Sequence, residues 1–186
     1  MAAPLRRCVL VSASPRRKEL LEAAGYEVVV RVPSVDESFS GPDSRQAVVE
    51  IAERKLDAVP PTDELAVAAD TLVLVDDERL GKPADEDAAR DMLRRLSGRM
   101  HEVVTGFAVA RGGARRRGVV ATRVWFRPLS ALEIERYVSS GDPLDKAGAY
   151  AIQGGAGAFV DKLEGSYTNV IGLPLAEVLV AMESLT

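Results

Sequence analysis

Two adjacent arginines, Arg16 and Arg17, occupy the first turn of the helix that the sequence predicts over residues 15–24. Ser14 and Pro15 stand directly before them, and a serine cap followed by proline is a typical helix start. The amino end of a helix already carries a partial positive charge, so cations are expected there only where an anion also binds. A guanidinium group binds phosphate oxygens through two parallel hydrogen bonds. The segment therefore predicts a phosphate site, and the alternative is that both arginines point into solvent.

Two further charged residues lie at positions where the spacing of the neighbouring apolar residues predicts a buried side chain. Lys55 lies in the middle of the apolar face of the helix expected over residues 43–59. Asp70 interrupts the apolar strand expected over residues 65–77, and Thr71 follows it on the opposite face of that strand. A buried charge needs a counter-ion. Lys55 must therefore meet an anion or extend its ammonium group into solvent, and Asp70 must meet a cation, bind a metal or lie at a strand end. A purely structural salt bridge is the alternative for Asp70.

Three weaker signals accompany these residues. Asp36 and Glu37 could supply oxygen ligands for a hard divalent cation, although a solvated turn is the more ordinary explanation for them. Lys82 follows a turn, where a surface lysine is ordinary. His101, the single histidine, has no cysteine or serine partner at a useful spacing and is predicted to be structural. The sequence has no Walker motif, which excludes a P-loop enzyme. The lysines, arginines and carboxylates together indicate metal-assisted chemistry on a phosphorylated small molecule.

Composition excludes several classes of protein. The chain has 186 residues, 47% of them apolar, and a net charge of −4, which suits one domain and gives no basic stripe for a nucleic-acid polymer. A single cysteine, Cys8, and no Cys/His cluster argue against disulfides and a zinc site, and favour a reducing compartment. No stretch resembles a leader or a membrane span, so we expect a cytoplasmic protein without a membrane partner.

The elements that must position the charged residues alternate between strands and helices. The expected elements are a strand at 7–14, the helix at 15–24, extended chain at 26–38 interrupted by Pro33, the helix at 43–59, the strand at 65–77, a helix at 85–98, a hairpin at 101–129 turning at Gly112–Gly113, a helix capped by Ser130, and a final helix opened by Pro174. Residues 147–167 are predicted as short strands alternating with glycine turns. This order predicts an α/β domain with a mixed sheet.

An ordered set of short motifs resembles the Maf family, the septum-formation-like nucleoside triphosphate pyrophosphatases. The matching pieces are SASPRR (12–17), VDES (35–38), ERK (53–55), ADT (69–71), GKP (81–83), LSG (96–98), TG (105–106), DKAGAYAIQG (145–154) and GSYTNVIGLPL (165–175). The resemblance implies one domain over residues 1–186, with a mixed, strongly twisted central sheet, flanking helices and two lobes around a cleft. It also implies hydrolysis of a nucleoside triphosphate to the monophosphate and pyrophosphate with Mg²⁺ or Mn²⁺, and a homodimer as the family-level expectation.

Residue roles follow from the resemblance. It implies that Asp70, Lys55 and Lys82 are catalytic, with Asp70 as general base for the attacking water. It implies further that Ser14, Arg17, Lys55 and Lys82 clamp phosphates, and that Glu37 and Asp70 are linked to the metal. Arg16, Thr71 and Gln153 match the branch that prefers dTTP and UTP, and the Gln153 amide suits a pyrimidine edge.

Two other functions stay open at this point. One is the branch that prefers 7-methyl-GTP, and the other is a regulatory protein that binds nucleotide without turnover. The resemblance also implies house-cleaning of non-standard nucleotides and a link to cell-division arrest, for which the sequence offers no mechanism.

Overall fold

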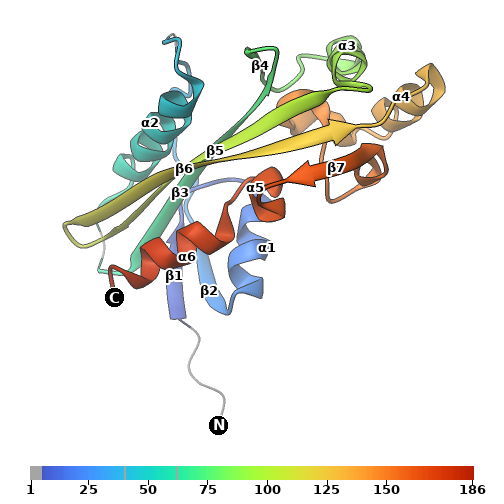
Figure 1. Ribbon diagram of the computed structural model, residues 1–186. Helices are drawn as coiled ribbons and strands as arrows, with labels where there is room; N and C mark the ends of the chain where they lie inside the picture. The colour runs from blue at the N-terminus through green and yellow to red at the C-terminus, as the bar shows by residue number, and fades with distance from the viewer. Residues whose placement is uncertain (1–5, 40, 62) are drawn as a thin grey trace. The chain divides into compact units, whose positions relative to one another are not determined.

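The computed structural model describes residues 6–39, 41–61 and 63–186. Residues 1–5, on which the expectation about a leader partly rests, lie outside the described residues. The strands are β1 (Arg6–Leu10), β2 (Tyr26–Val30), β3 (Leu65–Val75), β4 (Glu78–Leu80), β5 (Met100–Arg111), β6 (Ala114–Phe126) and β7 (Val160–Glu164). The α-helices are α1 (Pro15–Ala23), α2 (Ser44–Asp57), α3 (Glu86–Leu96), α4 (Ala131–Val138), α5 (Tyr167–Ile171) and α6 (Leu175–Glu183) (Figure 1).

The strands form one mixed sheet, as the sequence predicts. Their order is β2-β1-β3-β5-β6-β7, and β4 pairs with β3 beside this path. Strand β1 is parallel to β2 and β3, whereas β4 is antiparallel to β3 and β7 is antiparallel to β6. The α/β class is therefore confirmed.

The chain divides into two compact units, and β3, β5 and β6 each pass from one to the other. Unit 1 contains residues 1–70, 105–120 and 172–186, and unit 2 contains residues 71–104 and 121–171. No helix in the described part of the chain is long and apolar enough to cross a membrane.

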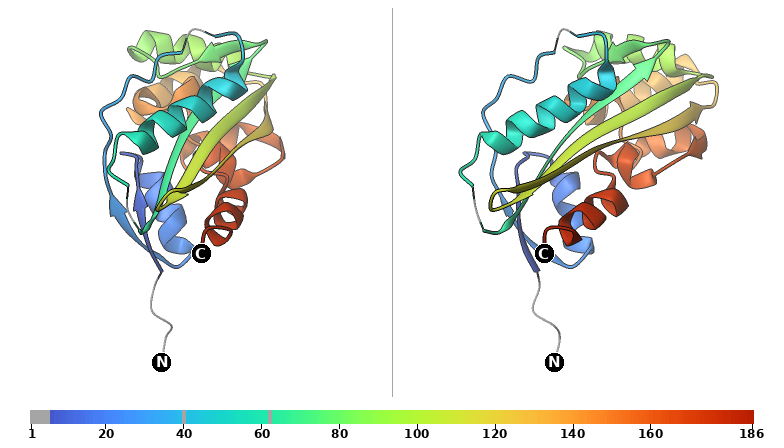
Figure 2. Two further views of the ribbon diagram at one scale, coloured as in Figure 1. Left: turned by 90° about the vertical axis from the view of Figure 1, so that its left-hand side faces the viewer. Right: turned by 60° about the vertical axis from the view of Figure 1, so that its left-hand side comes forward.

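In unit 1, helices cover both faces of the strands: α2 packs on one face, and α1 and α6 pack on the other (Figures 1 and 2). Successive residues of a strand point to opposite faces. In β3, Ala66 and Ala68 accordingly pack toward α2, while Val67 and Ala69 pack toward α1 and α6. Asp70 continues the register of Ala66 and Ala68, so the alternation directs its carboxylate toward α2.

Gly106 of β5 lets α2 approach the sheet closely. A Cβ atom at this position would lie 2.4 Å from backbone atoms of Val48 and Val49 in α2, closer than real contacts allow.

Cys8 of β1 is fully buried in unit 1, and burial raises the pKa of its thiol to about 12. This cysteine therefore acts as a packing residue.

Unit 2 has its own apolar core, built from the far halves of β3, β5 and β6 together with α3, α4 and the segment before β7. His101 lies in this core with 1% of its surface exposed, and its Nε2 is 2.8 Å from the Tyr150 hydroxyl. The ring also packs edge-on against Phe126. Burial lowers the pKa of His101 to about 4, so the imidazole is neutral at physiological pH.

Two sequence predictions about unit 2 differ from the structure. Instead of several short strands, residues 147–159 form two 3₁₀ helices, η2 (Ala147–Ala149) and η3 (Gly155–Phe159), joined by a turn, and β7 follows them. A further 3₁₀ helix, η1 (Asp142–Asp145), precedes η2. Gly148 is the physical reason, because its φ of 69° turns the chain tightly and a Cβ there would lie 2.9 Å from Val73. The predicted strand at 65–77 ends at Val75, where Asp76 and Asp77 adopt positive φ and form the turn to β4.

Candidate active site

Lys55, Asp70 and Glu37 form one ion-pair cluster in unit 1, which we call the Lys55 cluster. The Lys55 Nζ lies 2.7 Å from Asp70 Oδ1 and 2.8 Å from Glu37 Oε1. The side chains of Lys55 and Asp70 are 6% and 12% exposed, whereas that of Glu37 is 52% exposed. The prediction that Lys55 sits on a buried helix face is confirmed, and it meets anions there. A buried carboxylate thus lies next to a solvent-facing one, with a single ammonium group bound to both.

Local sequence explains how α2 presents Lys55 to this cluster. Asp43 caps the helix, since its Oδ1 accepts hydrogen bonds from the backbone N–H groups of Arg45 and Gln46. Of the two expected caps, Asp43 and Ser44, the structure has the first. Lys55 falls in the last turn of the helix, on the face that packs against β3.

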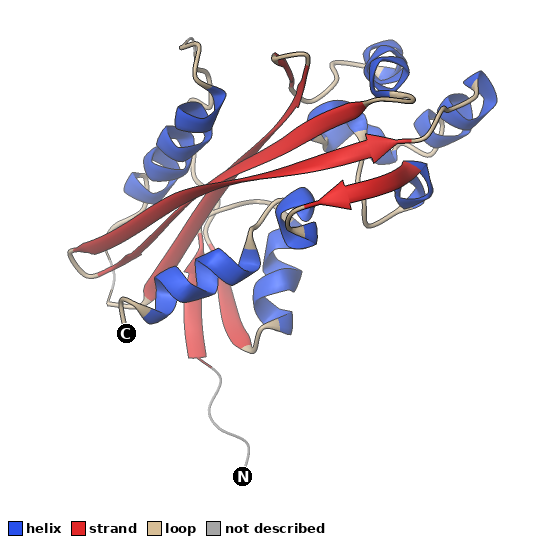
Figure 3. Cartoon of the chain, in the orientation of Figure 1, coloured by secondary structure: helices blue, strands red, loops and turns tan. Residues whose placement is uncertain are grey.

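Glu37 belongs to residues 31–39, which form no regular element (Figure 3), and two neighbours hold this loop in place. Arg54 donates to the carbonyl oxygens on both sides of Glu37, at 2.7 Å to Asp36 and 3.1 Å to Ser38. The Asp36 carboxylate accepts from the backbone N–H and the hydroxyl of Ser38, both at 2.8 Å, and these bonds lower the pKa of Asp36. Asp36 is therefore a turn-forming residue, and Glu37 is the carboxylate that faces Lys55.

The paired arginines of α1 have different surroundings. Ser14 is the N-cap residue, as predicted, but its side chain makes no capping hydrogen bond. Arg17 is only 8% exposed; its Nε donates to the carbonyl of Gly172 at 2.7 Å and its Nη1 to the hydroxyl of Ser12 at 3.0 Å. Arg16 is half-buried. The alternative that both arginines point into solvent is therefore wrong for Arg17.

Electrostatics links Arg17 to the Lys55 cluster. Burial lowers the pKa of the Arg17 guanidinium, and the negative charges of Asp70 and Glu37 act in the opposite direction. The buried cation thus lies within the field of the same two carboxylates that bind Lys55.

The other predicted site residues, Thr71, Lys82 and Gln153, belong to unit 2. Thr71 is half-buried and directly follows Asp70 in β3, whereas the side chains of Lys82 and Gln153 are exposed. The segments that carry Lys82 and Gln153 are joined through their backbones, because the N–H of Gly148 donates to the carbonyl of Gly81 at 3.0 Å.

The carboxylates of the Lys55 cluster fit a metal that arrives with a polyphosphate. Among the described residues there is no group of three or more His, Cys, Asp or Glu side chains that could hold a metal ion. Mg²⁺ is commonly bound by one or two carboxylates together with water and substrate phosphates. Glu37 and Asp70 match this donor set, because both already bind one cation, the Lys55 ammonium group.

Sequence reasoning gave no role to Arg54, Ser12 or Gly172, although all three lie in segments that carry the family resemblance. Arg54 directly precedes Lys55 and reads as an ordinary surface arginine, because its partners are backbone carbonyl groups. Ser12 and Gly172 both bind Arg17, and Gly172 lies 155 residues away along the chain. Local sequence patterns carry no signal for such contacts.

Comparison with known proteins identifies the family of this chain. The chain is 51% identical over 176 residues to a dTTP/UTP pyrophosphatase of Anaeromyxobacter dehalogenans, covering 92% of this chain and 90% of that protein. Proteins with the same name from Citrifermentans bemidjiense and Hahella chejuensis are 50% and 44% identical, covering 94% and 96% of this chain and 93% and 92% of theirs. The family model described as Maf-like protein matches residues 7–185. The chain therefore belongs to the Maf family.

Proposed function

We propose that this protein hydrolyses nucleoside triphosphates to the monophosphate and pyrophosphate, with dTTP and UTP as preferred substrates. Relatives that are 44–51% identical over more than nine-tenths of the chain carry the name dTTP/UTP pyrophosphatase. The observation that carries the proposal is the Lys55 cluster, because it combines a buried carboxylate, a buried cation and a solvent-facing carboxylate. We treat residues 1–186 as one catalytic domain, since the family match extends over both units.

In this proposal Asp70 is the general base for the attacking water. Its Oδ1 accepts the hydrogen bond from Lys55, which holds the carboxylate in a fixed orientation. Its Oδ2 then accepts a proton from the water while the water oxygen bonds to the α-phosphorus. The bond from that phosphorus to the bridging oxygen breaks, and pyrophosphate leaves with the electron pair. A bound Mg²⁺ or Mn²⁺, held by Glu37 and Asp70, would neutralise charge on the triphosphate.

Four side chains with cationic or hydroxyl groups, those of Ser14, Arg17, Lys55 and Lys82, are proposed to bind the phosphates. Ser14 has a hydroxyl group that is not used for capping, at a helix end that favours anions. Lys55 and Lys82 supply ammonium groups. Arg17 would act on the phosphates through its buried charge while it also secures the Gly172 carbonyl.

Base preference is assigned to Arg16, Thr71 and Gln153. The exposed amide of Gln153 offers one donor group and one acceptor, which match neighbouring positions on a uracil or thymine edge. A site that forms hydrogen bonds to one edge rejects bases that leave its polar groups unpaired. A homodimer remains a prediction.

An activity panel tests the proposal. Pyrophosphate release is measured with dTTP, UTP, CTP, GTP and 7-methyl-GTP in the presence of Mg²⁺, for the wild type, Asp70→Asn and Asp63→Asn. Asp63 is an exposed aspartate of unit 1 and serves as the matched control. We expect dTTP and UTP to be preferred, and only Asp70→Asn to lose activity. Preference for 7-methyl-GTP, or binding without turnover, would replace this proposal by one of the two other functions.

A further inference from the structure

A phenol hydroxyl, that of Tyr137, binds the backbone next to the turn that carries Gln153. The backbone N–H of Ala151, two residues before Gln153, donates a 3.1 Å hydrogen bond to the Tyr137 hydroxyl. Ala151 is 9% exposed and Tyr137 is 7% exposed, so water has little access to either group. Without this acceptor the Ala151 N–H would be left unsatisfied in a buried environment.

Helix α4 places Tyr137 at this position. Ser130 and Glu133 form a capping box that fixes the start of the helix. The Tyr137 ring packs edge-on against Phe159, with ring centroids 5.2 Å apart. The ring is therefore held by packing, and its hydroxyl lies within hydrogen-bond distance of the Ala151 N–H.

Asp142 determines which way the hydroxyl hydrogen points. The Tyr137 hydroxyl lies 3.0 Å from Asp142 Oδ2, and a carboxylate can only accept a hydrogen bond. The hydroxyl hydrogen is therefore directed at Asp142, which leaves an oxygen lone pair for the N–H of Ala151. Lys146, 8% exposed, completes the chain of contacts, since its Nζ lies 3.1 Å from Asp142 Oδ1.

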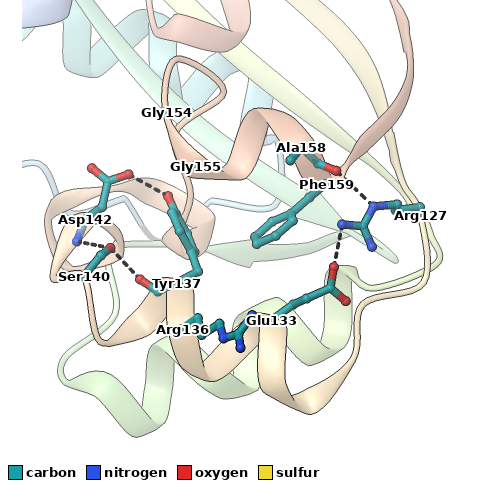
Figure 4. A pocket seen from close by; sticks show the side chains of 10 residues that line it. All are labelled: Arg127, Glu133, Arg136, Tyr137, Ser140, Asp142, Gly154, Gly155, Ala158 and Phe159. Atoms are coloured by element: carbon teal, nitrogen blue, oxygen red, sulfur yellow. Dashed lines mark hydrogen bonds and ion pairs between the residues drawn. The ribbon is translucent and has the colours of Figure 1, made fainter.

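The backbone after Gln153 rests directly on the same two side chains. A Cβ atom at Gly154 would lie 3.1 Å from Asp142 Oδ2, and one at Gly155 would lie 3.3 Å from the Tyr137 ring. Figure 4 shows these four residues in the wall of a pocket of about 640 Å³ in unit 2.

We propose that Tyr137, oriented by Asp142, is a positioning residue that fixes the Gln153 turn and thereby sets the preference for a pyrimidine base. The inference rests on the proposed role of Gln153 in base recognition. It adds two residues, Tyr137 and Asp142, to the determinants of specificity, and both act through the backbone beside Gln153.

The test removes the hydroxyl and keeps the ring. Tyr137→Phe is compared with wild type by calorimetric binding of the α,β-imido analogues of dTTP and dGTP, with Mg²⁺ present, so the readout does not need turnover. We expect the dTTP-over-dGTP affinity ratio to fall about tenfold, which corresponds to about 1.4 kcal/mol. Tyr167→Phe is the matched control, because that phenol lies in the same unit and is 49% exposed. The control should leave the ratio unchanged.

A double-mutant cycle shows whether Tyr137 acts through Gln153. In the Gln153→Ala background, Tyr137→Phe should have no further effect on the ratio. If the two changes add independently, or if Gln153→Ala lowers the ratio and Tyr137→Phe does not, the positioning role is overturned and the proposed function survives. If Gln153→Ala itself leaves the ratio unchanged, the base-reading role of Gln153 fails and this inference fails with it.

A second variant covers the case in which Tyr137→Phe does not fold, as judged by its thermal melt. Asp142→Asn keeps the Tyr137 ring and hydroxyl but removes the charge that orients the hydroxyl and pairs with Lys146. Like Tyr137→Phe, it should lower the dTTP-over-dGTP affinity ratio. An unchanged ratio in this folded variant overturns the inference.

Discussion

Replacing Lys55 by methionine should lower the free energy of unfolding by about 3–5 kcal/mol, the usual cost of breaking a buried ion pair from one side. Methionine has a similar length and apolar stem, so the loss of unfolding free energy reports on the missing ammonium group. Two unit charges 2.7 Å apart attract by about 6 kcal/mol at an effective dielectric constant of 20. Desolvation of both groups offsets part of this attraction. After the substitution Asp70, with a side chain only 12% exposed, is left without its cation.

Urea unfolding at pH 7 measures this cost against a matched control. Lys18 pairs with Glu22 at 2.6 Å, but their side chains are 41% and 43% exposed, so Lys18→Met should cost less than about 0.5 kcal/mol. The double variant Lys55→Met/Asp70→Leu should recover about 2 kcal/mol or more, since it leaves no uncompensated carboxylate. If Lys55→Met costs no more than Lys18→Met, the buried pair does not exist as described.

Three further predictions follow from other parts of the molecule. Because burial lowers the pKa of His101 from 6.5 to about 4, the unfolded chain binds a proton in this range that the folded chain does not. The free energy of unfolding, measured with urea, should therefore fall by about 2 kcal/mol between pH 7 and pH 5. The His101→Gln variant should lack this fall, and an equal pH dependence in both proteins would contradict the prediction. Arg54→Gln should speed amide exchange of residues 31–39 about tenfold by removing two bonds to their carbonyls, whereas unchanged exchange would mean that Arg54 does not hold the loop. Gln153→Glu should reduce the dTTP-over-dGTP ratio of kcat/KM about tenfold, because a carboxylate cannot donate; an unchanged ratio would remove Gln153 from base recognition.

Periodicity is the reason that the Lys55 cluster could be anticipated from sequence. Lys55 sits on an apolar face with helical spacing, and Asp70 interrupts an apolar strand, so both positions are buried whatever the rest of the fold. A buried charge requires a partner, and each residue supplies the partner that the other needs. The mixed sheet was predictable for a related reason, because long strands and helices have strong patterns.

Contacts to the backbone of distant segments explain what the sequence could not show. Arg17 reads as an arginine for solvent or phosphate, yet its Nε binds the carbonyl of Gly172. Tyr137 reads as an ordinary core aromatic, yet its hydroxyl binds the N–H of Ala151. Every residue has a carbonyl group and nearly every residue has an N–H, so side-chain patterns do not reveal which of them will be used.

Residues 147–159 were mispredicted because they offer neither a helical nor a strand period. Alanine and glycine there allow close packing, and the outcome depends on Gly148 fitting against Val73. Glycine marks a turn in such a stretch but does not distinguish a strand break from a 3₁₀ turn.

In the proposed reaction, water attacks the α-phosphorus of dTTP and Asp70 takes up the proton of that water. The most direct test is hydrolysis of dTTP with Mg²⁺ in isotopically labelled water, with the products separated and analysed by mass spectrometry. We predict dTMP and pyrophosphate in equal amounts, the label in dTMP alone, and a rate about 10²- to 10⁴-fold lower in folded Asp70→Asn. Release of dTDP and inorganic phosphate, label in the pyrophosphate, or an Asp70→Asn variant as fast as wild type would contradict this mechanism.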